Sequence, residues 1–373
     1  MRIGILKETH FEDNRIALTP AGIQSLVEKG HSVFVEKDAG LQSNFTNNEF
    51  ESVGAKLVYS QEEAVNRSEL ILKVSPFSDE EALKLNPEQI IFSALHLFMR
   101  RKLVDIFLEK KITSIGFELV ENKEGHLPIL GAMSEIAGQM SIQIAARYLE
   151  NNFEISRGVL LGGIAGVAPA AVVILGAGTV GINASRAAIG LGAQVVILDK
   201  DIHKLKQVEE LLGKHITTVV MNQYTVERGV KFADVLIGAV LIKGEKAPHV
   251  VTESMVKSMK PGAVIIDVSI DQGGCIETSR PTTLTNPVYI MHDVIHYCVP
   301  NIPALVARTA SYGLNNIVVD YVQQIADLGI EEAMKSNAGL TSGVCTHNGS
   351  CTNETLAEIF NLEYRRIHIF SKN

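Results

Sequence analysis

An apolar run that opens directly into a glycine loop is the feature that most limits how this chain can fold. Val172 to Leu175 reads as a buried strand, and Gly176-Ala177-Gly178-Thr179-Val180-Gly181 follows it with G-x-G-x-x-G spacing at the start of a helical pattern. The next apolar strand ends in Asp199, 18 residues after Gly181. This order of strand, loop, helix, strand and acid predicts one βαβ unit of a parallel sheet.

Each part of this unit has a physical role in binding a dinucleotide. Gly176 allows a tight turn, Gly178 lets the backbone approach a pyrophosphate, and Gly181 lets helix and strand pack closely. The helix N-terminus offers N–H groups and a positive dipole end to phosphates. Asp199 can accept hydrogen bonds from both ribose hydroxyls and would repel a 2′-phosphate. The segment therefore predicts NAD rather than NADP as the cofactor, with a glycine turn that binds nothing as the alternative.

Strands and helices alternate on both sides of this unit. Apolar runs with strand character precede it at Arg2–Leu6, Ser32–Val35, Leu70–Val74, Ile90–Leu95 and Ile115–Glu118, and others follow at 194–198, Thr217–Val220, Val235–Ile237, Val264–Val268 and Val288–Met291. Ser134 is expected to cap a connecting helix from Glu135 to about Leu149. The pattern is helical after Val306 and weak around 336–353, and this tail can pack on either half. Because 373 residues exceed the size of one core, we expect two α/β domains.

Composition narrows the class of protein. A net charge of −8 argues against nucleic-acid and anionic-membrane partners, which require clustered Lys and Arg. Residues 158–185 carry no charge, but their seven glycines and Pro169 favour turns and a buried strand over a membrane span. The N-terminus becomes charged too early for a signal peptide. Four cysteines are too few for a disulfide scaffold and are expected to be free thiols. These features predict a soluble cytoplasmic enzyme.

Four polar side chains are candidates for chemistry, each with a plainer alternative. Lys73 lies in an apolar run, where a buried ammonium needs a partner, so it is an edge position or a site lysine. His96 follows the run Ile90–Leu95 and could move protons, or be structural. Arg15 could fork a substrate carboxylate, or lie on the surface. Asp271, at a strand end, could serve the site or form a turn. No His/Cys cluster has metal-ligand spacing, so no metal is expected.

Over nearly its full length the sequence resembles the alanine dehydrogenase and transhydrogenase family. The segments that carry the resemblance are Lys7-Glu8, Arg15–Pro20, Leu95-His96-Leu97, Met133–Gly138, Arg157–Gly163, the glycine loop, Asp271–Thr283, His296–Val299, Asn301, Pro303 and Arg308-Thr309. The resemblance implies two Rossmann-like domains linked by long helices. Residues 134–303 would form a central NAD-binding domain, and residues 1–133 with 304–373 a discontinuous substrate domain. It also implies a homohexamer.

The resemblance further implies residue roles. Arg15 is similar to the residue that clamps the substrate carboxylate, Lys73 to a lysine that polarises the substrate carbonyl, and His96 to the acid/base. Asp271 matches a carboxylate beside the reacting centre, and Asn301 borders the nicotinamide and the substrate. The NAD path would be lined by Ser134, Gly176, Gly178, Thr179, Val180, Gly181, Asp199, Ala239, Val240, Leu241, Val268, Ile270, Asp271 and Asn301.

The chain departs from the family pattern next to Lys73. The family usually reads Lys-Val-Lys-Glu-Pro, whereas this chain has Lys73-Val74-Ser75-Pro76-Phe77. Gln139 stands where an arginine is common, and Val220 and Met221 replace an expected hydroxyl contact to the cofactor. The expected reaction is NAD-dependent, reversible oxidative deamination of L-alanine to pyruvate and ammonia. The alternatives are a dehydrogenase for another small amino or imino acid, a transhydrogenase-like NAD-binding subunit, and a silent NAD sensor.

Overall fold

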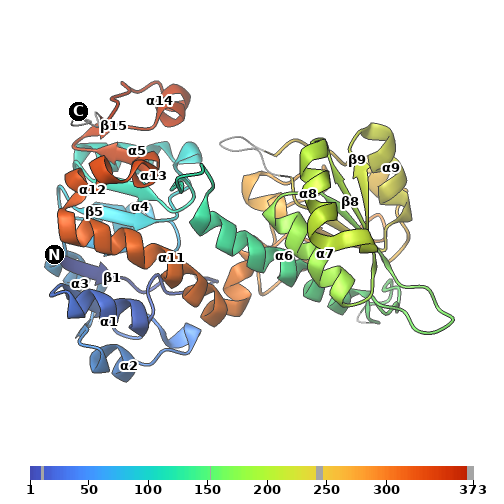
Figure 1. Cartoon of the computed structure of the whole chain (residues 1–373), viewed down its shortest axis with the longest axis horizontal. Coiled ribbons are helices and arrows are strands. Elements are labelled where there is room, and N and C mark those ends of the chain that lie inside the picture. The colour runs from blue at the N-terminus through green and yellow to red at the C-terminus, as the bar shows by residue number, and fades with distance from the viewer. Residues whose placement is uncertain (10–11, 152, 241–246, 368–373) are drawn as a thin grey trace. The chain divides into compact units, whose positions relative to one another are not determined.

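The computed structural model describes residues 1–9, 12–151, 153–240 and 247–367. The chain divides into two compact units, Met1–Met133 with Ala304–Asn373 (unit 1) and Ser134–Pro303 (unit 2). In Figure 1, unit 1 combines the blue and cyan N-terminal elements with the orange and red C-terminal ones, and unit 2 is mostly green and yellow. Each unit contains its own sheet between helices, so the expected two-domain α/β fold is confirmed.

Unit 1 is built on an eight-stranded sheet in the order β15-β14-β6-β5-β4-β1-β2-β3. The strands are β1 (Arg2–Ile5), β2 (Ser32–Glu36), β3 (Lys56–Val58), β4 (Leu70–Leu72), β5 (Ile90–Ser93), β6 (Thr113–Gly116), β14 (Val344–His347) and β15 (Ser350–Cys351). Strands β1 to β6 are parallel, and β14 pairs antiparallel with both β6 and β15. The strand order reverses between β1 and β4, so the carboxyl ends of these two strands mark a switch point where ligands bind in such sheets.

Alternate residues of each strand in unit 1 face opposite layers of helices. Leu70 and Leu72 belong to one core, and Ile71 between them belongs to the other. The first core is covered by α1 (Pro20–Glu28), α2 (Asn47–Ser52), α11 (Ala307–Leu328), α12 (Ile330–Ser336) and α13 (Ala338–Ser342). The second is covered by α3 (Gln61–Arg67), α4 (Asp79–Lys84), α5 (Arg101–Glu109) and α14 (Glu354–Phe360).

Unit 2 has a seven-stranded sheet in the order β12-β13-β11-β10-β7-β8-β9, parallel except for β12. Its strands are β7 (Ala171–Leu175), β8 (Gln194–Asp199), β9 (Ile216–Val220), β10 (Val235–Gly238), β11 (Val264–Asp267), β12 (Val288–Met291) and β13 (Val294–Tyr297). Helices α6 (Pro128–Leu149), α7 (Thr179–Gly190) and α8 (Ile202–Leu212) contribute to the core on one face of this sheet. Helices α9 (Gln223–Phe232) and α10 (Glu253–Val256) contribute to the core on the other face. The switch point lies between β7 and β10, directly beyond the glycine loop.

The structure corrects several local expectations. Helix α6 begins at Pro128, so Ser134 lies inside this helix and does not cap it; proline is well suited to a first helical turn because its φ is already helical. The stretch 336–353 was expected to be weakly structured but contains α13, β14 and β15. Strand β13 was not anticipated. All four cysteines are buried free thiols, as expected. Within the described part of the chain, no helix combines the length and apolar character needed to span a bilayer.

Candidate functional site

The glycine loop of unit 2 is held by close backbone contacts. Gly176 has φ of +106°, and a Cβ built there would lie 2.3 Å from the carbonyl oxygen of Ala239 beyond β10. A Cβ on Gly181 would lie 1.9 Å from the carbonyl oxygen of Gly176. Both distances are far below ordinary contact, and the opposing atoms are backbone, which cannot rotate away. These two glycines are therefore required by the fold of the loop itself.

Gly178 differs from its two neighbours in the motif. It caps α7 with φ of −82°, which any residue can adopt, and a Cβ there would meet no atom within 4 Å. The protein's own packing therefore does not require a glycine at this position. Open space lies in front of the first turn of α7, whose N–H groups and dipole favour an anion. A glycine that only an approaching ligand would require fits a pyrophosphate lying against this backbone.

Asp199 at the end of β8 braces the same loop. Its Oδ2 accepts a hydrogen bond from Ala177 N at 2.7 Å, and its Oδ1 accepts one from Asp201 N at 2.8 Å. A carboxylate has about four acceptor positions, so both oxygens can also accept from ribose hydroxyls. The residues that line the loop thus fit a dinucleotide with an unmodified ribose.

A second acid, which is not among the predicted site residues, shapes the loop beyond β11. Asp267 is fully buried, and it accepts hydrogen bonds from the amides of Ser269, Cys275 and Ile276 at 3.1, 3.0 and 3.3 Å. Burial raises the pKa of Asp267, although these hydrogen bonds oppose the rise. The only sequence signal was an acid at the end of the apolar run Val264–Val268. Asp267 fixes the loop that carries Asp271.

The remaining predicted residues of unit 2 follow the ends of strands or lie in helices, with Thr179 and Val180 in the first turn of α7 and Ser134 in α6. Asp271 is exposed in the short 3₁₀ turn Val268–Gln272, where Val268 is partly buried and Ile270 buried. Asn301 has a left-handed φ of +60°. Ala239 and Val240 follow β10, Ser134 lies in α6, and all three are partly buried. Leu241 lies outside the described residues.

In unit 1, Arg15 is held by a carboxylate two residues away. Asp13 accepts hydrogen bonds from Arg15 Nε at 2.8 Å and Nη2 at 2.6 Å, and Arg15 Nη1 lies 3.4 Å from Met133 Sδ. Burial raises the pKa of Asp13, but the charge and hydrogen bonds of Arg15 outweigh it and lower the pKa to about 2. The hydroxyl of Ser75 donates a short hydrogen bond to Asp13 Oδ2. The structure thus brings Arg15 together with Asp13 and Ser75.

Lys73 lies just beyond β4, and its side chain is 1% exposed. Its ammonium lies 3.2 Å from Glu81 Oε2, 3.3 Å from the Pro76 carbonyl oxygen and 3.6 Å from Glu8 Oε2. Its ammonium thus donates hydrogen bonds to Glu81 and to the Pro76 carbonyl, and Glu8 is an ion-pair partner beyond hydrogen-bond distance. The role of Lys73 toward a substrate carbonyl stays a prediction. The partners Glu8 and Glu81 were not predicted, because neither lies next to Lys73 in the sequence.

His96 lies at the carboxyl end of the next strand, β5, and is exposed. Its backbone is left-handed, with φ of +47°. The carboxylate of Glu118 holds this turn, because Oε1 accepts from His96 N at 2.7 Å and both its oxygens accept from Leu95 N at 3.2 Å. The sequence signalled Glu118 only as an acid at the end of an apolar run. Its contacts keep the His96 imidazole at the sheet edge, where a proton carrier is accessible.

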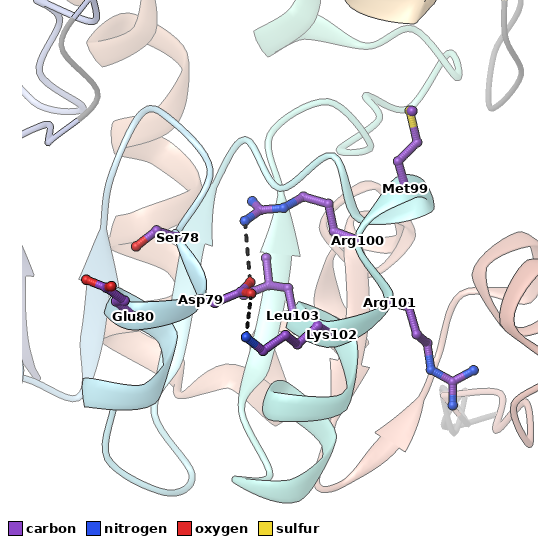
Figure 2. A pocket seen from close by; sticks show the side chains of 8 residues that line it. All are labelled: Ser78, Asp79, Glu80, Met99, Arg100, Arg101, Lys102 and Leu103. Atoms are coloured by element: carbon purple, nitrogen blue, oxygen red, sulfur yellow. Dashed lines mark ion pairs between the residues drawn. The ribbon is translucent and has the colours of Figure 1, made fainter.

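A surface pocket of about 540 Å³ lies at the starts of α4 and α5, and part of its lining follows His96 closely in the sequence (Figure 2). Its lining residues are Ser78, Asp79, Glu80, Met99, Arg100, Arg101, Lys102 and Leu103. Asp79 pairs with Lys102 at 3.0 Å and Arg100 at 3.8 Å, whereas Arg101 points away toward Asp105. None of the predicted site residues lines this pocket.

Comparison with known proteins covers both units. The family model "Alanine dehydrogenase/PNT, N-terminal domain" matches residues 4–137, and "Alanine dehydrogenase/PNT, C-terminal domain" matches residues 141–354. An alanine dehydrogenase of Methanococcus maripaludis is 46% identical over 98% of each chain, and one of Mycobacterium tuberculosis 44% over 96% of each. A solved L-alanine dehydrogenase is 40% identical with a TM-score of 0.92, covering 97% of this chain and 99% of that one. A transhydrogenase from Sinorhizobium meliloti shares the fold, with 24% identity and a TM-score of 0.80. The match covers 95% of this chain and 99% of that one.

Proposed function

Because the chain belongs to the alanine dehydrogenase/PNT family, we propose that it catalyses the reversible oxidative deamination of L-alanine with NAD. The observation that carries this proposal is the similarity to curated alanine dehydrogenases at 42–46% identity over nearly the whole chain. L-alanine, NAD⁺ and water would give pyruvate, ammonium, NADH and a proton. The enzyme would work in the cytoplasm as a homohexamer, without nucleic-acid or membrane partners.

Unit 2 is proposed to hold the cofactor. The loop Gly176–Gly181 and the N-terminus of α7 would bind the pyrophosphate, and Asp199 the adenosine ribose. The cofactor path would continue past Ala239 and Val240 to the loop that carries Asp271. When bound, NAD⁺ supplies the acceptor for the hydride that leaves the α-carbon of the substrate.

Unit 1 is proposed to hold the substrate. Arg15 would bind the substrate carboxylate and fix the orientation of the α-carbon. Asp13 holds Nε and Nη2 of Arg15, which fixes the plane of the guanidinium that would meet the substrate carboxylate. Lys73 would donate a hydrogen bond to the substrate carbonyl and polarise it.

His96 is proposed as the acid/base. After hydride transfer, a water molecule adds to the iminium carbon, and the imidazole would take the proton that the water loses. It would return a proton to nitrogen as ammonia leaves, and take the hydroxyl proton as the carbonyl of pyruvate forms. Asp271 and Asn301 would border the reacting centre, where the carboxylate of Asp271 favours the cationic iminium.

The test is a comparison of NADH oxidation with pyruvate and ammonia against a panel of other 2-oxo acids with ammonia. Pyruvate as the best substrate supports the proposal. A different preferred acid would favour the alternative suggested by Ser75, whose hydroxyl is bound to Asp13 where the family usually carries a lysine. Hydride transfer between dinucleotides without any amino or oxo acid would favour a transhydrogenase-like subunit. NADH binding with no turnover in either assay would indicate a sensor.

A further inference from the structure

A buried carboxylate connects the carboxyl ends of β1 and β4 at the switch point of unit 1. Glu8 follows β1, and its two oxygens accept from consecutive amides beyond β4, Val74 N at 2.6 Å and Ser75 N at 3.1 Å. Its side chain is 3% exposed. One carboxylate that accepts from two successive N–H groups fixes the direction of the backbone at both residues.

Lys73 holds Glu8 from the other side. Its ammonium lies between Glu8 and Glu81, and Glu81 is itself fixed by the amide of Ser78 at 2.7 Å and the hydroxyl of Thr9 at 2.8 Å. A buried carboxylate without a cation would be very costly, so the nearby ammonium of Lys73 offsets part of the cost of burying Glu8. The lysine therefore supports the position of Glu8.

The segment that Glu8 fixes leads directly to Arg15. Ser75 donates its hydroxyl proton to Asp13 Oδ2, and Asp13 accepts from Arg15 through two parallel hydrogen bonds. Ser75, Asp13 and Arg15 are each less than one-tenth exposed. A displacement of the Ser75 backbone would thus be passed to Asp13 and then to the guanidinium plane.

We propose that Glu8, clamped by Lys73, is a positioning residue that sets the orientation of Arg15 through Ser75 and Asp13. The inference rests on the proposed function, in which Arg15 binds the substrate carboxylate. Two-point binding of a carboxylate depends on the guanidinium plane being held within about 10–20° of its productive orientation. Glu8 supplies this constraint without touching the substrate, the cofactor or the reacting atoms.

The test compares two variants with a matched control. Glu8→Gln keeps the size of the side chain but has only one acceptor atom for the two amides. Ser75→Ala removes the hydroxyl and leaves every buried charge in place. The control Glu69→Gln makes the same chemical change at an exposed carboxylate that accepts from a backbone amide, Arg2 N at 2.8 Å, at the opposite end of β1. The measurements are KM for the 2-oxo acid, kcat, the Kd of NADH and the melting temperature.

We expect Glu8→Gln and Ser75→Ala to raise KM about tenfold, with kcat within about threefold of wild type and an unchanged Kd for NADH. A merely structural ion pair would lower the melting temperature without this separation of KM from kcat. A folded Glu8→Gln variant with the KM of wild type overturns the proposal. If Glu8→Gln does not fold, Ser75→Ala decides, and an unchanged KM in that variant overturns it. A wild-type protein inactive with every 2-oxo acid would instead overturn the proposed function.

Discussion

Two glycines of one motif, Gly178 and Gly181, should respond to alanine in opposite ways. The Cβ of Gly178→Ala would meet no protein atom within 4 Å, and the native φ of −82° is open to alanine. Loss of glycine's freedom in the unfolded chain should therefore stabilise this variant by about 0.4–1 kcal/mol. The same methyl group would occupy the space proposed for the pyrophosphate, so we expect the Kd of NADH to rise at least about tenfold, or ~1.4 kcal/mol.

Gly181→Ala should instead lower the stability of the fold. Its Cβ would lie 1.9 Å from the Gly176 carbonyl oxygen, about 1.5 Å inside the 3.4 Å at which ordinary contact begins. Alanine's better helix propensity returns at most about 1 kcal/mol. The overlap is with backbone, so we expect a net loss at or above the ~1–3 kcal/mol usual for overpacked sites.

Urea denaturation and NADH fluorescence titration of both variants measure the two effects separately. A Gly178→Ala variant that binds NADH as tightly as wild type would refute the placement of the pyrophosphate against this backbone. A Gly181→Ala variant of wild-type stability would refute the reading of the loop as closely packed.

Three further outcomes follow from the site geometry. His96→Ala should lower kcat at least about 100-fold in the pyruvate assay, with NADH titration unchanged; near-normal turnover would remove His96 from the mechanism. Asp199→Asn should raise the Kd of NADH and reduce the preference for NADH over NADPH. Unchanged Kd values for both nucleotides would contradict the contact between Asp199 and the ribose. Burial, opposed by the charge of Lys73, raises the pKa of Glu8 from 4.5 to about 7. Protonation of Glu8 therefore stabilises the folded state by up to roughly 3 kcal/mol. This contribution is fully present below pH 4.5 and is lost as the pH rises through 7. Urea denaturation at pH 5 and 8 should show this loss in wild type and not in Glu8→Gln; parallel curves would refute it.

Local pattern was enough to predict the parts of the fold whose geometry is set by neighbouring residues. The strand Val172–Leu175 and the loop Gly176–Gly181 are recognisable because the apolar run and the glycine spacing follow each other directly in the sequence, and because the contact of Gly181 with the Gly176 carbonyl is local. The strand β14 is not predicted from the sequence because its main partner is β6, whose Ser114 contacts Thr346 across 232 residues of sequence. A four-residue strand of this composition has no distinctive pattern of its own.

The site shows the same limit in its charges. The sequence indicated that Lys73 would need a partner in its apolar surroundings, but not that Glu8 and Glu81 would both provide one. The resemblance implies that Lys73 contacts the substrate, and the structure adds that its ammonium also lies near Glu8 and Glu81. The bracing roles of Glu8 and Glu118 could not be read in advance, because each depends on which strand lies beside its own in the sheet.

The late arrival of β14 also has a consequence during synthesis of the chain. Strand β6 can form as soon as its residues leave the ribosome, but the strand that covers its outer edge is made 232 residues later. At about 5–20 residues per second, that edge stays open for roughly 10–50 s. All of unit 2 is synthesised within this interval and can fold first. Each nascent chain thus carries an uncovered strand with unpaired N–H and C=O groups, the kind of surface on which neighbouring nascent chains pair and which chaperones protect.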